Sequence, residues 1–169
     1  KAANFHESVA VEIAWTVIPL LILLVMAWPA TKMVLRQYDT RGEDMTIKIT
    51  GYQWKWAYEY KNEGLSFFST LSTPEEQIDA YEGKQAASRG VNYLQEVDNP
   101  MVVPVDKKIR LLVTADDVIH SWAVQQLGVK QDAIPGFIKD TWFQAEKVGT
   151  YRGFCSELCG KNHGFMPIV

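Results

Sequence analysis

The sequence predicts a mainly β protein, of the β-sandwich or Greek-key barrel class, with one transmembrane helix near its beginning. Two observations predict this fold class. Residues 13–31 contain no charged side chain, whereas residues 45–169 contain many short apolar segments separated by turn residues. Short strands at close spacing, without a long helical pattern between them, are typical of sandwiches and barrels.

The uncharged stretch is long enough to cross a bilayer. At about 1.5 Å per residue it spans roughly 28 Å, close to the ~30 Å hydrocarbon core. Trp15 and Trp28 lie near its ends, where interfacial aromatic residues are common. No cleavage site of small residues follows, so we predict a retained transmembrane helix over 13–36 and not a signal peptide. Residues 1–12 form the flank before this helix, and residues 37–44 form a polar connector after it. The alternative interpretation of the uncharged stretch is a buried core helix.

The first strand pattern follows the connector. Over residues 45–50, apolar and polar side chains alternate, as in a strand with one buried face. At Gly51 the apolar set changes parity, and aromatic residues at every second position from Tyr52 to Tyr60 continue the pattern. A glycine at such a switch predicts a bulge or bend.

The rest of the domain, which we place at 45–169, consists of a polar insert and further short strands. The insert, 69–92, is rich in turn residues and shows no recognisable chemistry. Strand-like segments occur at 93–97, 101–105, 109–114, 118–124, 141–146 and 149–155. Turn signals such as Pro135-Gly136 separate them, so we expect a single β domain.

Charge limits the classes of partner. From Glu43 onward the chain carries 17 acidic and 13 basic residues. A mildly acidic domain argues against nucleic acid as a partner and is compatible with a basic protein. The positive residues after the helix, Lys32, Arg36 and Arg41, weakly favour placing the domain in the cytoplasm.

Sulfur and nitrogen donors are concentrated in one short segment. The stretch CSELCGKNHGFM contains two thiols, an imidazole and a thioether: Cys155, Cys159, His163 and Met166. A second imidazole, His120, lies on a predicted strand, and the loop could return beside it. A lone histidine on a strand is more often a satisfied core residue, so the nearby cluster is what makes His120 a candidate ligand.

The donor types favour copper. Thiolate, imidazole and thioether together select a soft metal ion, and a mononuclear blue-copper site needs one cysteine, two histidines and an axial methionine. This chain offers one cysteine more, and two cysteines four positions apart can bridge two copper ions. A Cys₂His₂ zinc site and a disulfide or thiol pair stay open, although the zinc spacing would be unusual and would leave Met166 unexplained.

These spacings resemble a known pattern. V-x-H at 118–120, followed by C-x₃-C-x₃-H-x₂-M at 155–166, is similar to the copper A signature of cytochrome c oxidase subunit II. Further stretches resemble that family: VEIAWTVIP, GYQWKWAYEY, EVDNPMVVPV, VIHSW and VKQDAIPG. The resemblance covers nearly the whole chain apart from insert 69–92. It implies a cupredoxin-like domain behind an anchor of usually two helices, of which this sequence would hold the second, with both ends trimmed.

The resemblance also implies the copper ligands. The thiolates of Cys155 and Cys159 would bridge the two copper ions. The remaining ligands would be the imidazoles of His120 and His163, the thioether of Met166 and the main-chain carbonyl of Glu157. The imidazole of His120 would share one copper with the thioether, and the other imidazole would share the second copper with the carbonyl. The Glu157 side chain would reach a magnesium or manganese ion at the interface with subunit I.

Other residues receive roles only through the resemblance. Trp54 would be the surface aromatic at which electrons from cytochrome c enter. Asp116, Asp117 and Asp132 would attract lysines of cytochrome c, in a salt-dependent manner. Glu12, at the start of the helix, would lie at the mouth of a proton-uptake path of subunit I. That role places the N-terminal flank in the cytoplasm and the copper domain on the periplasmic side, against the weak charge signal.

The expected function is that of a subunit of a terminal oxidase in the bacterial inner membrane. A dinuclear copper centre would accept electrons from cytochrome c and pass them to haem a in subunit I, where oxygen is reduced to water and protons are pumped. Subunits I and III and membrane lipid would be its neighbours. The rival interpretations are the copper A domain of nitrous oxide reductase and a membrane-anchored copper chaperone or structural zinc domain.

Overall fold

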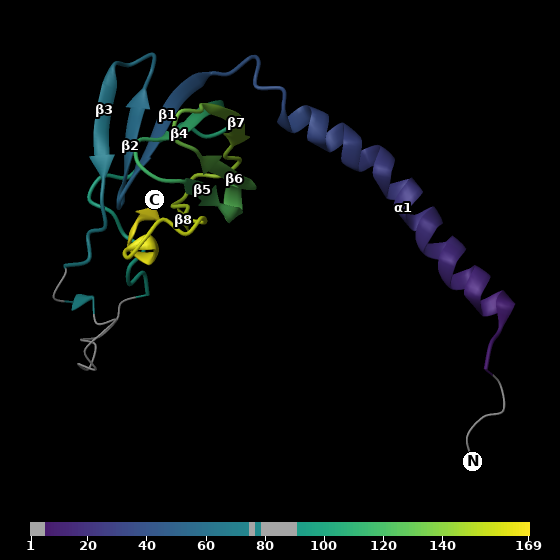
Figure 1. Cartoon of the computed structure of the whole chain (residues 1–169). Coiled ribbons are helices and arrows are strands. Elements are labelled where there is room, and N and C mark those ends of the chain that lie inside the picture. The colour runs from purple at the N-terminus through teal and green to yellow at the C-terminus, as the bar shows by residue number, and fades with distance from the viewer. Residues whose placement is uncertain (1–5, 75–76, 79–90) are drawn as a thin grey trace. The chain divides into compact units, whose positions relative to one another are not determined.

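The computed structural model describes residues 6–74, 77–78 and 91–169 (Figure 1). The chain divides into two compact units, residues 1–39 and 40–169. Among the described residues, the first unit contains a single helix, α1 (Val9–Gln37), and the second contains all the strands. The prediction of a mainly β protein with an N-terminal apolar helix is confirmed.

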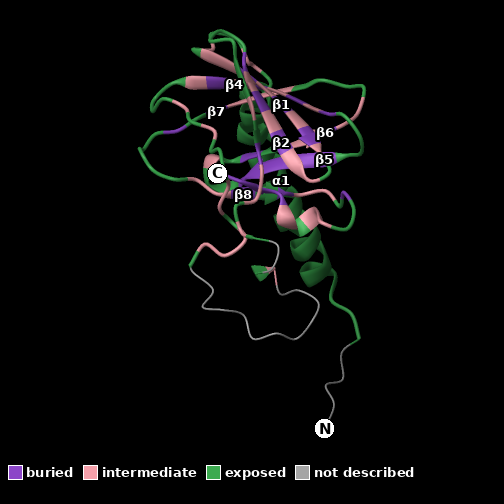
Figure 2. Ribbon diagram, turned by 90° about the vertical axis from the view of Figure 1, so that its left-hand side faces the viewer, coloured by how far each residue is buried: buried purple, intermediate pink, exposed green. Residues whose placement is uncertain are grey.

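Helix α1 is long and apolar enough to cross a membrane. Its 29 residues include none that is buried, and the helix is coloured as exposed along its length in Figure 2. Covering such a surface with lipid removes the cost of leaving it in water. The helix begins four residues before the predicted 13–36 span, so Glu12 lies in its first turn.

The larger sheet of the second unit has five strands in the order β3-β2-β1-β4-β7. Their bounds are β1 (Met45–Tyr52), β2 (Lys55–Tyr60), β3 (Leu65–Ser69), β4 (Lys108–Ala115) and β7 (Lys139–Gln144). Strands β1 and β4 are parallel, and the other neighbours are antiparallel. Buried residues alternate along β1, β2 and β4, so one face of this sheet lies against the core.

The smaller sheet has the order β6-β5-β8-β9. Its strands are β5 (His120–Val124), β6 (Val129–Ala133), β8 (Gly153–Cys155) and β9 (Pro167–Ile168). All five residues of β5 are buried, which places its first residue, His120, in the interior. A short 3₁₀ turn (Gln125–Leu127) links β5 to β6, and another (His163–Phe165) precedes β9.

Aromatic side chains join the two sheets. Trp56 and Tyr58 from β2 and Trp122 from β5 are almost completely buried, and the Trp122 Nε1–H donates to the Tyr58 hydroxyl at 3.3 Å. The Trp122 ring also stacks on Phe143 of β7, with centroids 6.3 Å apart. Burial of such large rings contributes strongly to the hydrophobic stabilisation of the domain.

The parity change at Gly51 has a different cause from the predicted bulge or bend. Strand β1 continues through Tyr52, and a two-residue loop, Gln53–Trp54, reverses the chain into β2, with Tyr52 paired to Lys55. The buried side chains are therefore at odd-numbered positions in β1 and at even-numbered positions in β2. Gly51 itself has a packing role, because a Cβ at this position would lie 2.9 Å from the ring of His120.

Two strand predictions were wrong. Residues 93–94 belong to a turn and 95–96 are irregular, and Val97 makes one isolated bridge with Leu71. Residues 101–105 are irregular, because Pro100 and Pro104 interrupt pairing and the hydroxyl of Tyr60 bonds both main-chain groups of Val102, at 2.7 and 2.9 Å. Strands β3, β6 and β9 were not anticipated. Most of the predicted insert 69–92 lies outside the described residues.

Candidate metal centre

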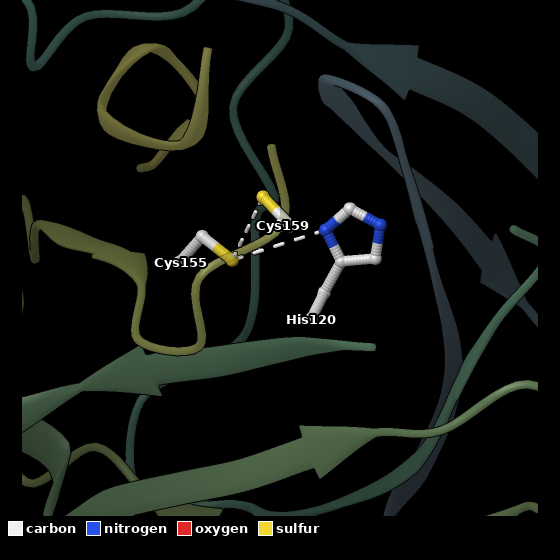
Figure 3. A group of neighbouring side chains, drawn as sticks. All are labelled: His120, Cys155 and Cys159. Atoms are coloured by element: carbon white, nitrogen blue, oxygen red, sulfur yellow. Dashed lines mark hydrogen bonds between the residues drawn. The ribbon is translucent and has the colours of Figure 1, made fainter. Parts of the chain in front are cut away.

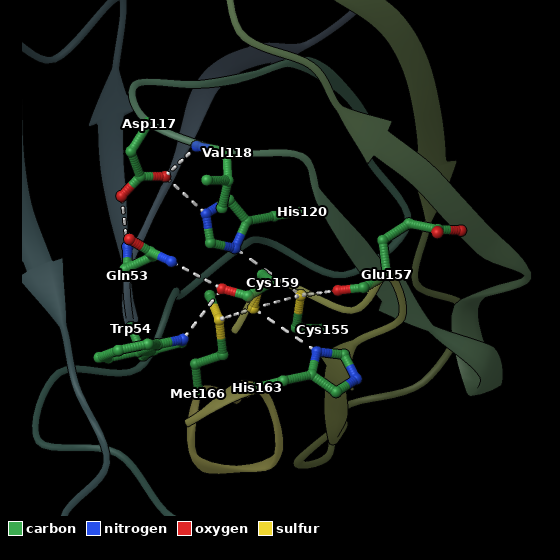
Figure 4. A network of polar contacts seen from close by, with 10 residues as sticks. All are labelled: Gln53, Trp54, Asp117, Val118, His120, Cys155, Glu157, Cys159, His163 and Met166. Carbon is green, nitrogen blue, oxygen red and sulfur yellow. Dashed lines mark hydrogen bonds and ion pairs between the residues drawn. The ribbon is translucent and has the colours of Figure 1, made fainter. Parts of the chain in front are cut away.

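Three segments far apart in the sequence meet at one end of the second unit (Figure 4). They are the β1–β2 turn, the start of β5 and the loop between β8 and β9. The sequence-predicted donors of the last two segments point toward one another, whereas the turn covers them from one side. The structure thus brings together residues that are far apart in the sequence, such as Gln53 and Cys159, which are 106 positions apart.

The two thiols form the middle of the cluster (Figure 3). Cys155 Sγ and Cys159 Sγ lie 3.7 Å apart, both cysteines are free, and each is 3% exposed. The thiols and an imidazole nitrogen of His120 all lie within 4.8 Å of one another. A buried pair of unbonded thiols beside an imidazole is a typical set of metal ligands.

Each sulfur has one imidazole and one weaker donor beside it. Cys155 Sγ lies 3.8 Å from His120 Nδ1 and 3.3 Å from the carbonyl oxygen of Glu157. Cys159 Sγ lies 3.5 Å from His163 Nδ1 and 3.5 Å from Met166 Sδ. Six donor atoms of the predicted types therefore surround one small volume.

The donor set fits a metal shared by two sulfurs. Metal–sulfur bonds of about 2.3 Å allow two bridging sulfurs to be at most roughly 4.6 Å apart, and the observed 3.7 Å lies within that limit. Six donors exceed the four of a structural zinc site. Thioether and thiolate together match copper better than zinc.

The environment favours a thiolate at the first cysteine. Burial raises the pKa of Cys155, but hydrogen bonds from His120 and main-chain groups outweigh it and lower the pKa to about 7. Burial and the charge of Cys155 raise the pKa of Cys159, because a second thiolate would stand beside the first. A cation between the sulfurs relieves this repulsion, so the pair is suited to binding a metal.

The floor of the site is closely packed. Trp56 is completely buried, its ring lies edge-on to His120 with centroids 5.9 Å apart, and its Nε1–H donates to the carbonyl of Met166 at 3.3 Å. One tryptophan thus contacts donors from both ligand segments. Fixed surroundings limit how far ligands move when the charge of a bound metal changes.

The β1–β2 turn is bonded to the ligand loop. Gln53 Nε2 and Trp54 Nε1 both donate to the carbonyl oxygen of Cys159, at 2.9 and 3.2 Å. Trp54 is half-buried, and a Cβ on Gly160 would come within 3.2 Å of its ring. The indole therefore lies directly on the loop that carries the second thiol.

The Glu157 side chain points away from the thiols (Figure 4). Its carboxylate lies 3.2 Å from Lys130 Nζ, and the same ammonium lies 2.9 Å from Asp132. Asp132 also accepts a hydrogen bond from the buried hydroxyl of Ser121 at 2.8 Å. The carboxylate of Glu157, the predicted magnesium or manganese ligand, thus forms an ion pair with Lys130 in this structure.

The remaining predicted residues lie outside the ligand cluster. Asp116 is exposed, and its main-chain N–H donates to the Gly51 carbonyl. Asp117 contacts His120 and Gln53 directly. Glu12 belongs to the other unit and is exposed on α1.

Sequence reasoning missed two residues of the site, Gln53 and Lys130. Both act through hydrogen bonds to segments distant in the chain, which no local pattern reveals. A partial signal existed for Gln53, because a polar residue inside an aromatic run at a parity switch marks a turn.

Comparison with known proteins identifies the family. The family model "Cytochrome C oxidase subunit II, periplasmic domain" matches residues 45–169. "Probable cytochrome c oxidase subunit 2" of Rickettsia felis is 44% identical over 167 residues, which cover 99% of this chain and 50% of the relative. "Cytochrome c oxidase subunit 2" of Cereibacter sphaeroides is 41% identical over 175 residues, covering 99% of this chain and 58% of the relative. The chain thus spans about half the length of these curated relatives.

A solved structure supports the same conclusion. The periplasmic domain of subunit II of cytochrome oxidase from Bradyrhizobium japonicum matches with a TM-score of 0.62 and 46% sequence identity, covering 76% of this chain and 83% of that domain. This likeness confirms the predicted cupredoxin-like fold. Residues 45–169, which the family model matches, contain every donor of the cluster, and the chain belongs to the cytochrome c oxidase subunit II family.

Proposed function

We propose that this chain accepts electrons from cytochrome c at a dinuclear copper centre and delivers them to haem a in subunit I of the oxidase. One observation carries the proposal: two buried thiols 3.7 Å apart, each with an imidazole nitrogen and a weaker donor beside it. Oxygen reduction and most of the proton pumping belong to subunit I in this proposal.

The chain's own residues would hold the copper pair in a dry, fixed pocket. Cys155 and Cys159 would bridge the ions, and the other four donors would complete them as the family resemblance implies. When bound, the pair supplies a store for a single electron. Because the pocket floor is already packed around the ligands, a change of oxidation state would require little rearrangement.

Trp54 would be the contact for cytochrome c. Its ring is half-buried, and its Nε1–H reaches the carbonyl of Cys159, so one hydrogen bond connects the indole to a copper ligand. Asp116 and Asp132 would contribute negative potential for a basic partner. Such steering acts mainly on the association rate and weakens with salt.

The remaining assignments complete the proposal. The Glu157 carboxylate would bind a magnesium or manganese ion at the interface with subunit I, and subunit I would supply most of the other ligands. The ion would displace Lys130 from the carboxylate. Helix α1 would cross the bacterial inner membrane among lipid and other subunits, with Glu12 at the cytoplasmic side beside the proton-uptake mouth. The copper domain would face the periplasm.

Electron paramagnetic resonance of the copper-loaded chain in detergent tests the centre. One unpaired electron shared by two coppers gives a many-line hyperfine pattern. A four-line mononuclear spectrum, or selective binding of silent zinc, would contradict the proposal.

The assignment of Trp54 has its own test. Trp54→Phe removes the Nε1–H bonded to Cys159 and should slow electron transfer from cytochrome c, with unchanged copper content. The matched control is Trp142→Phe, since that ring lies on β7 beside Lys108. Equal transfer rates in the two variants would show that electrons enter elsewhere.

A further inference from the structure

We infer that Asp117 is a positioning residue of the metal centre: it fixes the orientation of His120 and fastens the β1–β2 turn to the same site. This inference rests on the proposed copper function but assigns Asp117 a role different from attraction of cytochrome c. It follows from three hydrogen bonds that converge on one carboxylate (Figure 4).

Both carboxylate oxygens of Asp117 are occupied. Oδ1 lies 2.8 Å from His120 Nε2 and accepts the Val118 main-chain N–H at 2.6 Å. Oδ2 accepts the main-chain N–H of Gln53 at 2.7 Å. A carboxylate held by three donors cannot reorient toward an incoming protein without breaking these bonds.

The first contact selects one form of the imidazole. A carboxylate at Nε2 requires a proton on that nitrogen, so Nδ1, on the side of Cys155 Sγ, is the nitrogen available to a metal. Metal-binding histidines commonly donate their other N–H to a carboxylate in this manner. The ring is completely buried against Gly51 and Trp56, so it cannot turn over without disturbing the core.

The second contact reaches the aromatic turn. Gln53 donates its main-chain N–H to Asp117 and its side-chain amide to the Cys159 carbonyl, where the Trp54 indole also donates. The turn is therefore bonded to both ligand-bearing segments, and Asp117 supplies one of the two anchor points. Loss of the carboxylate would free His120 and the turn together.

The neighbouring Asp116 provides a matched control. It carries the same charge and is also exposed, yet its side chain takes part in none of these three hydrogen bonds. A docking role for Asp117 predicts that the two aspartates behave alike. A positioning role predicts that only Asp117 affects the copper centre itself.

The experiment compares Asp117→Asn with Asp116→Asn in the full chain in detergent. Asparagine keeps the shape but places an amino group against one of the three donors. Asp117→Asn should weaken copper affinity by roughly 10- to 100-fold and alter the hyperfine pattern and midpoint potential. Asp116→Asn should leave all three unchanged and only slow association with cytochrome c at low salt. Indistinguishable copper properties in the two variants would overturn the inference.

Nitrogen-15 NMR of the histidine side chains in the metal-free wild type supplies a second readout. The inference requires a proton on Nε2 of His120, whether or not Nδ1 is also protonated in the metal-free protein, and an unprotonated Nε2 would overturn it without any variant. This measurement separates the two proposals. A wild type that binds no copper pair would end the proposed function, while the protonated nitrogen of His120 would still decide the role of Asp117.

Discussion

At the scale of single residues, His120 shows how position gives a common side chain a special role. Its imidazole is completely buried, yet each ring nitrogen has a polar neighbour, Asp117 on one side and Cys155 on the other. The sequence made His120 a candidate ligand because two cysteines, a histidine and a methionine are clustered in one short segment. It could not supply the contact of Asp117 with the β1–β2 turn, because that hydrogen bond joins the Asp117 carboxylate to the main-chain N–H of Gln53, 64 positions away.

Gly51→Ala should test how closely the histidine is packed. The new Cβ would lie 2.9 Å from the His120 ring, at a paired position near the end of β1. We expect a loss of about 1–3 kcal/mol in the free energy of unfolding, as for other overpacked cores, together with a changed copper spectrum. Gly149→Ala, which meets nothing within 4 Å, is the control and should leave both unchanged. Urea denaturation and the copper spectrum are the measurements.

Met166→Leu should separate the ligand role of the thioether from its packing role. Met166 is 2% exposed, so a side chain of similar volume should cost less than about 1.5 kcal/mol. Loss of the sulfur near Cys159 should nevertheless shift the copper potential or spectrum. Met101→Leu, in a partly buried position against the core, gives the packing cost alone. A copper potential equal to that of the control would remove Met166 from the ligand set.

At the scale of elements, sequence patterns predicted strands best where one face is buried. Strands β1, β2 and β4 alternate in the sequence and alternate in burial. Strand β6 was missed because its sequence, VKQDA, shows polar residues along the middle and buries only its ends. The segment 101–105 was mistaken for a strand because its apolar residues contact the core from an irregular backbone.

Asp98 connects the irregular segment to the end of β3 and makes its stability depend on pH. Burial alone would raise the pKa of its carboxyl, but hydrogen bonds from the N–H and hydroxyl of Thr70 and from the N–H of Asn99 outweigh this and lower it below the ordinary 3.8. The unfolded chain therefore binds more protons in acid. The stabilisation is complete above the ordinary pKa and is lost as the pH falls through the lowered one.

Comparison with Asp98→Asn isolates this effect. The variant should be less stable than the wild type at neutral pH, where the charged carboxylate accepts three hydrogen bonds. The difference should shrink as the pH falls below 3.8, because the wild-type side chain then becomes neutral as well. Urea denaturation across this range is the measurement, and a constant difference would show that the hydrogen bonds do not depend on the charge.

At the scale of the whole molecule, the fold class could be predicted because it depends on patterns that repeat along the chain. An apolar helix and many short strands are visible without knowledge of pairing. The order of strands in the two sheets, including the parallel pair β1 and β4, was not visible, since it depends on contacts between distant segments. The roles of the site residues stay predictions until a metal is measured.

Removal of the metal should loosen the site without unfolding the domain. The buried cluster includes Ile47, Leu111 and Phe143, which lie on the five-stranded sheet and are outside the predicted ligand set. We expect the same far-ultraviolet circular dichroism with and without copper. Hydrogen exchange should increase mainly in the loop 156–166, and the melting temperature should fall by roughly 5–10 °C. Global loss of strand signal on chelation would show that the metal is needed for the fold.

The order of these elements along the chain has a consequence for biogenesis. Every strand of the five-stranded sheet, and the hairpin of β5 and β6, lies before residue 145, whereas both thiols lie after residue 154. A growing or translocating chain can therefore form most of its core before either cysteine has emerged. Copper, if bound as proposed, would then enter after most of the core has formed, so a metal-delivery factor would meet a nearly finished domain and not a nascent one.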